Sequence, residues 1–378
     1  MKNILILDHA YWFGGAEKVL VDYLKRHDKS KYNIIVGVTT ESEFTEKLKE
    51  INVDYKVFPL SKDFLKISRS KISFKNIINI FEYKSMINSI SDFVKENNID
   101  IIFTNSMKAH IYGGQVAKKT NVKAIARIHD VVNGDFISPL KSAIKRVFNN
   151  YFYHISCVSE TVKNSLIRIG VNENKLSVLY NGIPDMVPKY NEEYYRRLYN
   201  LSENDFIISV IGWIQPSKGQ LEIIKSLKDI LNNNIKLMII GDANEKNKDY
   251  LEKIKKYIEL NNLSNNVLLI GHTDDVSGHL ELTNVFIHYP YIDDSLPTVL
   301  IEALYHKKII IARNIGGIPE IINEKNGYLV DDIHEIKDII MNIYKSPEKY
   351  SKEIDSDYFH NKFSYEKYIK GIEELFEK

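Results

Sequence analysis

The sequence predicts an α/β protein made of two doubly wound parallel-sheet domains. First, its 378 residues, 44% of them apolar, exceed the ~100–150 residues that one ordinary core organises. Second, short β-branched runs alternate with longer amphipathic segments, as in strands joined by crossover helices. Third, this alternation stops once, at residues 180–201, where Asn181-Gly182 and two prolines precede a polar stretch, and then restarts.

The expected strands fall into two sets. In the first domain they are residues 4–7, 34–38, 100–104, 123–128, 155–158 and 177–179, and in the second 206–211, 236–240, 267–270, 285–287, 309–312 and 328–330. We place an N-terminal domain at 1–184 and a C-terminal domain at 185–354, and we expect a last helix of about 355–378 to return to the first domain. Parallel sheets bind ligands beyond the carboxyl ends of their strands, so two facing domains would hold a ligand in a cleft between them.

Charge divides along the same boundary. The chain has 51 Lys plus Arg against 50 Asp plus Glu, and a net charge of +1 argues against a general nucleic-acid coat. Residues 1–184 hold 27 basic and 18 acidic side chains, net +9, whereas 185–378 hold 24 and 32, net −8. The basic excess lies largely in 56–84 and 140–153, among aromatic and aliphatic residues. This pattern suits either an interfacial helix on anionic lipid or an ordinary solvated helix face.

The amino-acid composition indicates whether the chain folds and in which cellular compartment we expect it. With 17 Gly and 9 Pro the chain should fold throughout, and no apolar run approaches the ~20 residues of a membrane span. The apolar run at 4–7 is too short for a signal peptide. A single cysteine, Cys157, excludes an internal disulfide, so we expect a cytoplasmic protein.

Two strand-to-helix turns carry phosphate-binding features. Gly14-Gly15 follows the first strand and precedes a helix, where the backbone can approach an anion such as a diphosphate. The spacing lacks the third glycine of the dinucleotide fingerprint, which argues against an NAD enzyme. The second domain opens similarly, with Lys218-Gly219 before a helix. Lys218 could neutralise a phosphate, or it could be a solvent-exposed loop lysine.

The stretch 288–304 is the most informative. Pro297 stands where a helix can begin, which leaves backbone N–H groups of Leu296 and Thr298 available to a ligand. Asp294 precedes this helix, and Glu302 lies within it among apolar residues. A carboxylate in such a helix needs a partner, and the vicinal hydroxyls of a ribose would supply two donors. The alternatives are an exposed helix stripe or a pairing lysine.

These residues resemble the retaining glycosyltransferases of family four, which have the two-domain GT-B fold. That family carries two acidic residues eight apart, matched here by Asp294 and Glu302. Further matches follow in the family's order: Gly14-Gly15-Ala16-Glu17, His129-Asp130, Cys157-Val158-Ser159-Glu160, Asn181-Gly182-Ile183, Lys218-Gly219, Gly271-His272, Gly316-Gly317-Ile318-Pro319-Glu320 and Asn326-Gly327-Tyr328-Leu329-Val330. They span nearly the whole chain.

The resemblance implies that domain 1–184 binds the acceptor and that domain 185–354 binds the nucleotide-sugar donor. It also implies roles for individual residues. Glu302 would bind the nucleotide ribose, Asp294 the hydroxyls of the donor sugar, and Lys218 the diphosphate. His129 would face the donor sugar near the bond that breaks, although a histidine there could also simply cap a strand. The catalytic set is thus His129, Asp294, Glu302 and Lys218, and the donor-binding set is Gly14, Gly15, Lys218, Leu296, Pro297, Thr298 and Glu302.

Two positions depart from the family pattern. Trp213 stands where the family usually has an arginine, so one of two diphosphate cations is missing, with Arg313, Lys307 or a base of the first domain as replacements. Asp294 stands where Glu is commoner, which shortens its reach by one methylene group and bears on the identity of the donor sugar.

The resemblance implies a retaining hexosyltransferase that moves a sugar from a UDP- or GDP-sugar to a hydroxyl of a saccharide or polyprenyl-diphosphate-linked acceptor, in lipopolysaccharide, capsule or other surface-polysaccharide biosynthesis. We expect no metal, because no Asp-x-Asp cluster follows a suitable strand, and no other cofactor or nucleic acid. An anionic surface at the inner membrane face is a further hypothesis. The alternatives are a nucleotide-sugar epimerase of the same fold and a non-catalytic nucleotide-sugar-binding protein.

Overall fold

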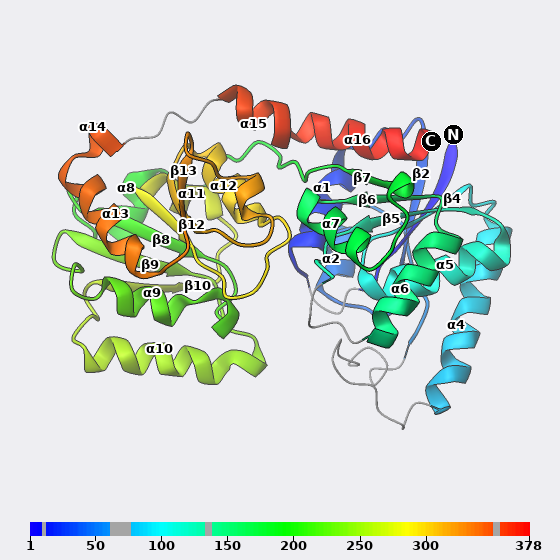
Figure 1. The fold of residues 1–378 in the computed structure, drawn as a ribbon, viewed down its shortest axis with the longest axis horizontal. Coiled ribbons are helices and arrows are strands. Elements are labelled where there is room, and N and C mark those ends of the chain that lie inside the picture. Colours follow the sequence, from blue (N-terminus) through cyan, green and yellow to red (C-terminus); the bar gives the residue numbers. More distant parts are fainter. Residues whose placement is uncertain (10–12, 61–76, 133–137, 351–355) are drawn as a thin grey trace. The chain divides into compact units, whose positions relative to one another are not determined.

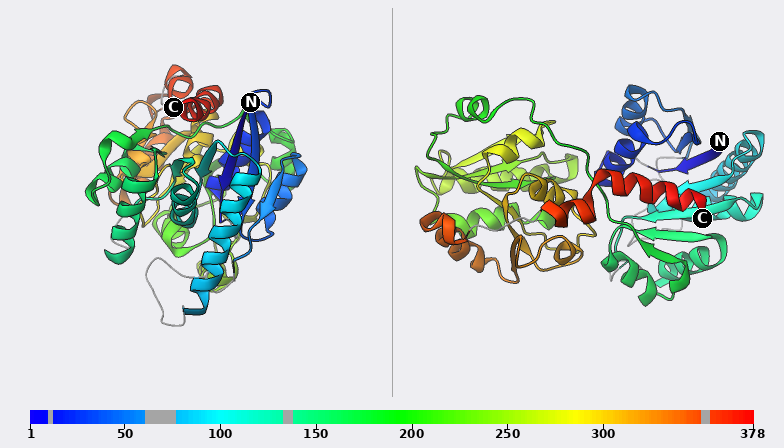
Figure 2. Two further views of the ribbon diagram at one scale, coloured as in Figure 1. Left: turned by 90° about the vertical axis from the view of Figure 1, so that its right-hand side faces the viewer. Right: turned by 90° about the horizontal axis from the view of Figure 1, so that it is seen from above.

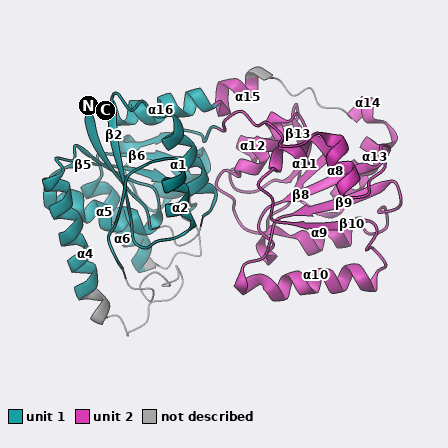
Figure 3. Cartoon of the chain, turned by 180° about the vertical axis from the view of Figure 1, so that it is seen from behind, with its two compact units in different colours: residues 1–182, 365–378 teal, residues 183–364 magenta. Residues whose placement is uncertain are grey.

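The chain forms two compact units in a computed structural model that describes residues 1–9, 13–60, 77–132, 138–350 and 356–378. Unit 1 comprises 1–182 and 365–378, and unit 2 comprises 183–364 (Figures 1 and 3). The chain passes between units at Gly182–Ile183 and again at Ser364–Tyr365. The sequence boundary at 184/185 lies two residues beyond the first crossing, and the returning segment starts ten residues later than expected.

Unit 1 is a seven-stranded sheet in the order β3-β2-β1-β4-β5-β6-β7, with every neighbouring pair parallel. The strands are β1 (Lys2–Leu7), β2 (Tyr32–Val38), β3 (Tyr55–Val57), β4 (Ile101–Thr104), β5 (Lys123–Ile128), β6 (His154–Cys157) and β7 (Leu176–Val178). The helical elements are α1 (Gly15–Arg26), α2 (Glu43–Glu50), α4 (Ile77–Glu96), α5 (Met107–Thr120), α6 (Ser138–Tyr151), α7 (Glu160–Arg168), η2 (Glu173–Lys175) and α16 (Tyr365–Glu377). All six expected strands are present, and β3 is additional.

Helices cover both faces of the unit 1 sheet. Ile4 and Ile6 of β1 enter one core cluster with buried residues of α1, α2 and α16. Strand side chains alternate between faces, so Leu7 and Thr104 point to the other side, where they lie against Gly113 of α5. Figure 2 shows α16 running along this unit, with the chain's two ends beside each other. Lys2 Nζ bonds the Phe376 carbonyl at 2.8 Å, which fixes the last helix to the first strand.

Unit 2 is a six-stranded parallel sheet in the order β10-β9-β8-β11-β12-β13. Its strands, all six of them expected, are β8 (Phe206–Ile211), β9 (Ile235–Ile240), β10 (Val267–Gly271), β11 (Val285–His288), β12 (Ile309–Arg313) and β13 (Gly327–Val330). Its helical elements are α8 (Glu192–Leu198), η3 (Pro216–Lys218), α9 (Gln220–Leu227), η4 (Glu245–Asn247), α10 (Lys248–Leu260), α11 (Val276–Leu282), α12 (Thr298–Tyr305), η5 (Ile318–Glu320), α13 (His334–Lys345), α14 (Pro347–Tyr350) and α15 (Ser356–Phe363).

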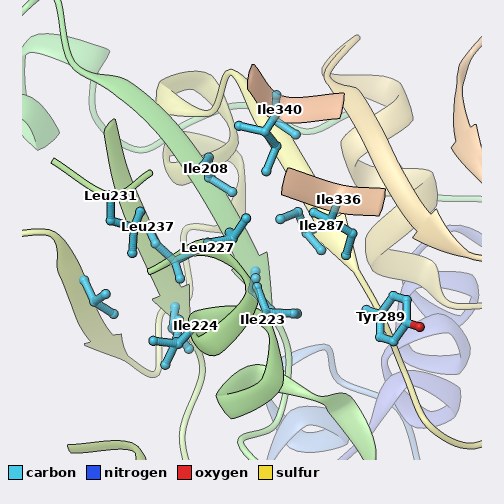
Figure 4. Packing of buried hydrophobic residues seen from close by; sticks show 14 of the residues in the cluster. Ile208, Ile223, Ile224, Leu227, Leu231, Leu237, Ile287, Tyr289, Ile336 and Ile340 are labelled. Atoms are coloured by element: carbon cyan, nitrogen blue, oxygen red, sulfur yellow. The ribbon is translucent and has the colours of Figure 1, made fainter. Parts of the chain in front are cut away.

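Unit 2 also buries both faces of its sheet. Figure 4 shows one face, where Ile208 and Ile287 of the strands meet Ile223 of α9 and Ile336 of α13. On the opposite face the Ser209 hydroxyl lies 2.8 Å from that of Thr283, at the end of α11. Two parallel sheets, each covered by helices, confirm the doubly wound α/β architecture.

The segment 356–363 corrects the expected C-terminal arrangement. We expected it to return to the first domain, but α15 belongs to unit 2. The Phe359 ring packs edge-on against Tyr305 of α12, and the Tyr358 hydroxyl bonds the Glu320 carbonyl at 3.1 Å. These contacts hold α15 on unit 2 and leave the return to α16 alone.

The charge division persists with the observed boundaries. Unit 1 contains 30 Lys plus Arg and 22 Asp plus Glu, net +8, and unit 2 contains 21 and 28, net −7. Of the basic segment 56–84, residues 61–76 lie outside the described residues. In the described part of the chain, no helix combines the length and apolar character needed to cross a bilayer.

Candidate active site

In unit 1, three polar side chains meet at the carboxyl ends of adjacent strands. Asp8 follows β1, Asn105 follows β4 and His129 follows β5. The Asn105 amide nitrogen donates to Asp8 Oδ2 at 2.8 Å, and its Oδ1 lies 3.0 Å from His129 Nε2. Asp8 and Asn105 are buried, and His129 is partly buried. The predicted residue His129 is thus the outermost member of a polar chain that starts in the sheet interior.

This chain of contacts determines the tautomer of His129. Because Asn105 donates through its nitrogen to a carboxylate, its oxygen remains as an acceptor, and His129 Nε2 must carry the proton. Burial lowers the pKa of His129 well below its usual value, and the Arg127 guanidinium adds to this effect. A neutral ring protonated on Nε2 therefore has an unprotonated Nδ1 that can accept a hydrogen bond.

The Gly14-Gly15 turn lies at the start of α1. Gly14 caps the helix, and its N–H donates to Glu17 Oε2 at 2.9 Å. No described atom lies within 4 Å of the position that a Gly15 side chain would occupy, so packing does not require glycine there. Burial first, and Asp8 second, raise the pKa of Glu17 to about 8. The loop residues 10–12 lie outside the described residues.

In unit 2, Lys218 and Asp294 form an ion pair. Lys218 Nζ lies 2.7 Å from Asp294 Oδ2, and both side chains are mostly buried, at 25% and 18% exposed. Burial alone would raise the pKa of Asp294, but Lys218 and His288 outweigh it and hold that pKa well below its ordinary value. The two residues are 76 positions apart, and the fold brings them together at the carboxyl ends of β8 and β11.

Glycines hold the loops that carry this pair. Gly219 has φ of +74°, and a side chain there would come 2.6 Å from the Tyr289 carbonyl. Tyr291 N donates to the Ser217 carbonyl at 2.8 Å, which ties the Lys218 turn to the Asp294 loop. On the other side, Gly317 N donates to the Asp294 carbonyl at 2.7 Å. The Gly316-Gly317 motif therefore packs against the backbone of Asp294 and fixes its position.

Helix α12 begins as the sequence predicts. Pro297 is its N-cap and Thr298 its first residue, while Leu296 and Pro297 are buried. Glu302 is only 3% exposed. Burial lowers the pKa of His306, one turn further on, whereas Glu281 and Glu302 raise it. Glu302 therefore faces the interior, which excludes the exposed-stripe alternative.

Two of the three proposed substitutes for the missing arginine, Arg313 and Lys307, lie in unit 2. The Arg313 guanidinium stacks at 5.1 Å on the rings of Tyr289 and Tyr291 and donates to the Pro290 carbonyl at 2.9 Å. Lys307 follows the C-terminal end of α12, whereas Thr298 stands at the N-terminal end of that helix. Trp213 itself is 48% exposed.

The structure adds residues that sequence reasoning did not select. In unit 1 these are Asp8, Asn105 and the buried Glu17, and in unit 2 His288. Each except Glu17 ends or directly follows a strand, so the rule that ligands bind at strand ends could have marked them. Lys218 and Asp294 are brought into contact, and so are Gly14 and Glu17.

Comparison with known proteins places this arrangement in a family. Residues 13–185 match the model of Glycosyltransferase Family 4, and residues 191–356 match that of Glycosyl transferases group 1. The chain belongs to the family-four glycosyltransferases. The two models fall on the two halves of the chain and together cover most of this glycosyltransferase.

Individual relatives agree. The glycosyltransferase is 26% identical over 274 residues, 68% of each chain, to the UDP-Gal:alpha-D-GlcNAc-diphosphoundecaprenol alpha-1,3-galactosyltransferase of Escherichia coli. It is 30% identical over 190 residues, 47% of this chain and 48% of the other, to the capsular polysaccharide biosynthesis glycosyltransferase CapM of Staphylococcus aureus. The crystal structure of Anabaena HepE in complex with UDP matches over 100% of both chains with a TM-score of 0.86 and 20% identity. That likeness confirms the GT-B fold.

Proposed function

We propose that this glycosyltransferase transfers a hexosyl group from a nucleoside-diphosphate sugar to a saccharide or polyprenyl-diphosphate-linked acceptor, with retention of anomeric configuration, in surface-polysaccharide assembly. The observation that carries the proposal is the loop and helix 294–302, in which Asp294 pairs with Lys218 and Glu302 is buried eight residues later. The relatives support this substrate class, since one uses a UDP-sugar donor and a lipid diphosphate acceptor and another acts in capsular polysaccharide biosynthesis.

The residues fit the demands of glycosyl transfer. The bond from the anomeric carbon to the diphosphate oxygen breaks, and the leaving diphosphate needs positive charge. Lys218 and the N–H groups at the start of α12 supply it within unit 2. The His129 ring is neutral, so it can form a hydrogen bond with a sugar hydroxyl without bringing a positive charge next to the sugar. The acceptor oxygen forms the new bond to the anomeric carbon on the face that the diphosphate leaves, and the proton of the acceptor hydroxyl passes to the leaving phosphate.

The direct test is a donor screen by thermal stabilisation with UDP-, GDP- and other nucleotide sugars, on wild type and three variants. Lys218→Ala and Glu302→Ala should each weaken binding roughly ten- to a hundredfold, because each removes a buried or charge-assisted contact. His129→Ala should leave binding nearly unchanged and slow transfer by about tenfold or more. The exposed Lys246, replaced by alanine, is the matched control.

Three outcomes would contradict the proposed transferase function. A Glu302→Ala enzyme with wild-type turnover would overturn the assignment. Conversion of the donor sugar to its epimer without any acceptor would identify the epimerase instead, and tight nucleotide binding with neither transfer nor slow hydrolysis would identify a binding protein.

Metal independence is part of the proposal. Lys218 and backbone N–H groups carry the role that a divalent ion has in other sugar transferases. We expect full turnover in excess EDTA, and loss of turnover that Mg²⁺ or Mn²⁺ restores would contradict this. Retention is tested separately, since an inverted linkage in the NMR spectrum of the product excludes it.

The acceptor side of the proposal rests on the basic unit 1. On α6, Ile144 and Phe148 are buried, whereas Lys145 and Arg146 are exposed. This helix keeps its apolar stripe in the core and can offer only charge to an anionic surface. Co-sedimentation with anionic but not neutral vesicles is expected, and indifference to lipid charge would remove the membrane hypothesis.

A further inference from the structure

His288 ends β11 with a buried nitrogen that lacks a hydrogen bond. Its side chain is 5% exposed, and its Nε2 has no hydrogen-bond partner among the described residues. The nearest acidic oxygen is Asp294 Oδ2, at 3.4 Å, which is longer than the about 2.7–3.2 Å of a normal N–H···O bond. Buried polar atoms without partners are rare in folded proteins, so this one requires an explanation.

Lys218 already binds the Asp294 oxygen with which His288 could form a hydrogen bond. Asp294 Oδ2 receives the Lys218 ammonium at 2.7 Å, and none of the described residues donates to Asp294 Oδ1. Two nitrogens thus converge on one carboxylate oxygen, one at bonding distance and one just beyond it. The other oxygen remains for a ligand.

Donor binding changes this balance if the proposed function holds, and the inference rests on that function. A diphosphate attracts Lys218, whose four-carbon stem is flexible. When Lys218 turns to the phosphate, it leaves a mostly buried carboxylate without its counter-charge, which is costly. Burial lowers the pKa of His288, so its ring is neutral and can present one N–H.

We propose that His288 is a positioning residue for Asp294, which takes over the Oδ2 atom when the donor diphosphate draws Lys218 away. A shift of a few tenths of an ångström brings the two atoms into bonding range. Asp294 then stays ionised and oriented, with Oδ1 toward the donor sugar. The contact with His288 also fixes the position of the Asp294 carboxylate, whose side chain is one methylene group shorter than that of the commoner glutamate.

A double-mutant cycle tests the proposal by measuring the affinity for UDP, with GDP in parallel, by calorimetry. His288→Leu should weaken nucleotide binding about tenfold, since it leaves the carboxylate uncompensated once Lys218 departs. Asp294→Asn should bind at least as tightly as wild type, because Lys218 is no longer held. In the Asp294→Asn background, His288→Leu should have an effect below about twofold. His288→Gln, which keeps an N–H at the same reach, should restore most of the affinity.

The outcomes are distinguishable. Equal losses from His288→Leu in both backgrounds, or no loss in either, would overturn the proposal while leaving the proposed function intact. Wild type that binds neither nucleotide would overturn the proposed function and this inference with it. Thermal unfolding without ligand monitors the fold, and His279→Leu, which removes another buried histidine of unit 2, is the control for general destabilisation.

Discussion

Glu17 is a carboxyl group kept in the interior of unit 1. It accepts the Gly14 N–H and lies near Asp8 at the end of β1 and Asp130 after β5, and its pKa is raised to about 8, mainly by burial. The unfolded chain loses this proton near pH 4.5, so between about pH 4.5 and 8 the folded state binds more protons. The free energy of unfolding should therefore fall as pH rises across this range.

Glu17→Gln should remove that dependence, because the amide keeps an acceptor for Gly14 N–H but does not ionise. Urea unfolding at pH 5.5 and pH 8 would measure it. We expect the variant to show a flatter pH dependence than wild type and to be the more stable of the two at pH 8. Identical slopes for both proteins would show that Glu17 is ionised in the folded state.

Arg127 is a fully buried cation without a carboxylate partner among the described residues. It bonds Ser156 Oγ and Asn181 Oδ1, both at 2.8 Å, and stacks 5.6 Å from the Tyr368 ring. Its charge lowers the pKa of His129, second to burial. Arg127→Met should therefore raise the pKa of His129, although burial will keep it below its ordinary value.

An NMR titration of the His129 ring, in wild type and Arg127→Met, tests this. The acid limb of the pH–rate profile should move to higher pH by the same amount. A variant that folds but leaves the His129 titration unchanged would mean that the Arg127 charge is screened from the site.

At the scale of elements, α16 is a structural part of unit 1. Phe376 packs edge-on against Tyr23, Tyr32 and Phe103 at 5.4–6.4 Å between ring centroids. Phe376→Ala should lower the free energy of unfolding by about 3–5 kcal/mol, since it empties a fully buried aromatic site. Glu374→Ala, on the exposed side of the same helix, should change it by less than about 0.5 kcal/mol. Equal effects would refute the packing argument.

The sequence predicted elements well where hydrophobic periodicity is strong. All twelve expected strands are present. The additional strand β3 was not predicted, because its three residues at the sheet edge include an exposed lysine and show no buried run. The loops of the site were also predicted, since glycine and proline mark them locally. The Lys218–Asp294 pair and the Asp8–Asn105–His129 chain were not, because they join residues from different strands and depend on strand order.

At the scale of the whole molecule, the chain crosses between the units twice, so one unit is a single segment of the sequence and the other consists of two segments. Unit 2 is one continuous segment, 183–364, whose first and last residues, Ile183 and Ser364, form an isolated parallel bridge. The core cluster of Figure 4 draws only on residues of that segment. Unit 1 is discontinuous, because Tyr368, Ile372 and other residues of α16 enter the core that holds β1 and β2.

Fragments should therefore behave differently. Residues 183–364 expressed alone should fold with a single cooperative thermal transition, whereas 1–182 should be insoluble or partly unfolded, because the missing helix exposes a large apolar face of its core. Joining 365–378 to 1–182 through a flexible linker should restore cooperative unfolding to unit 1. The comparison of 1–182 with and without that helix is decisive, since equal stability would mean that α16 is dispensable and that the unit 1 core is complete within the first 182 residues.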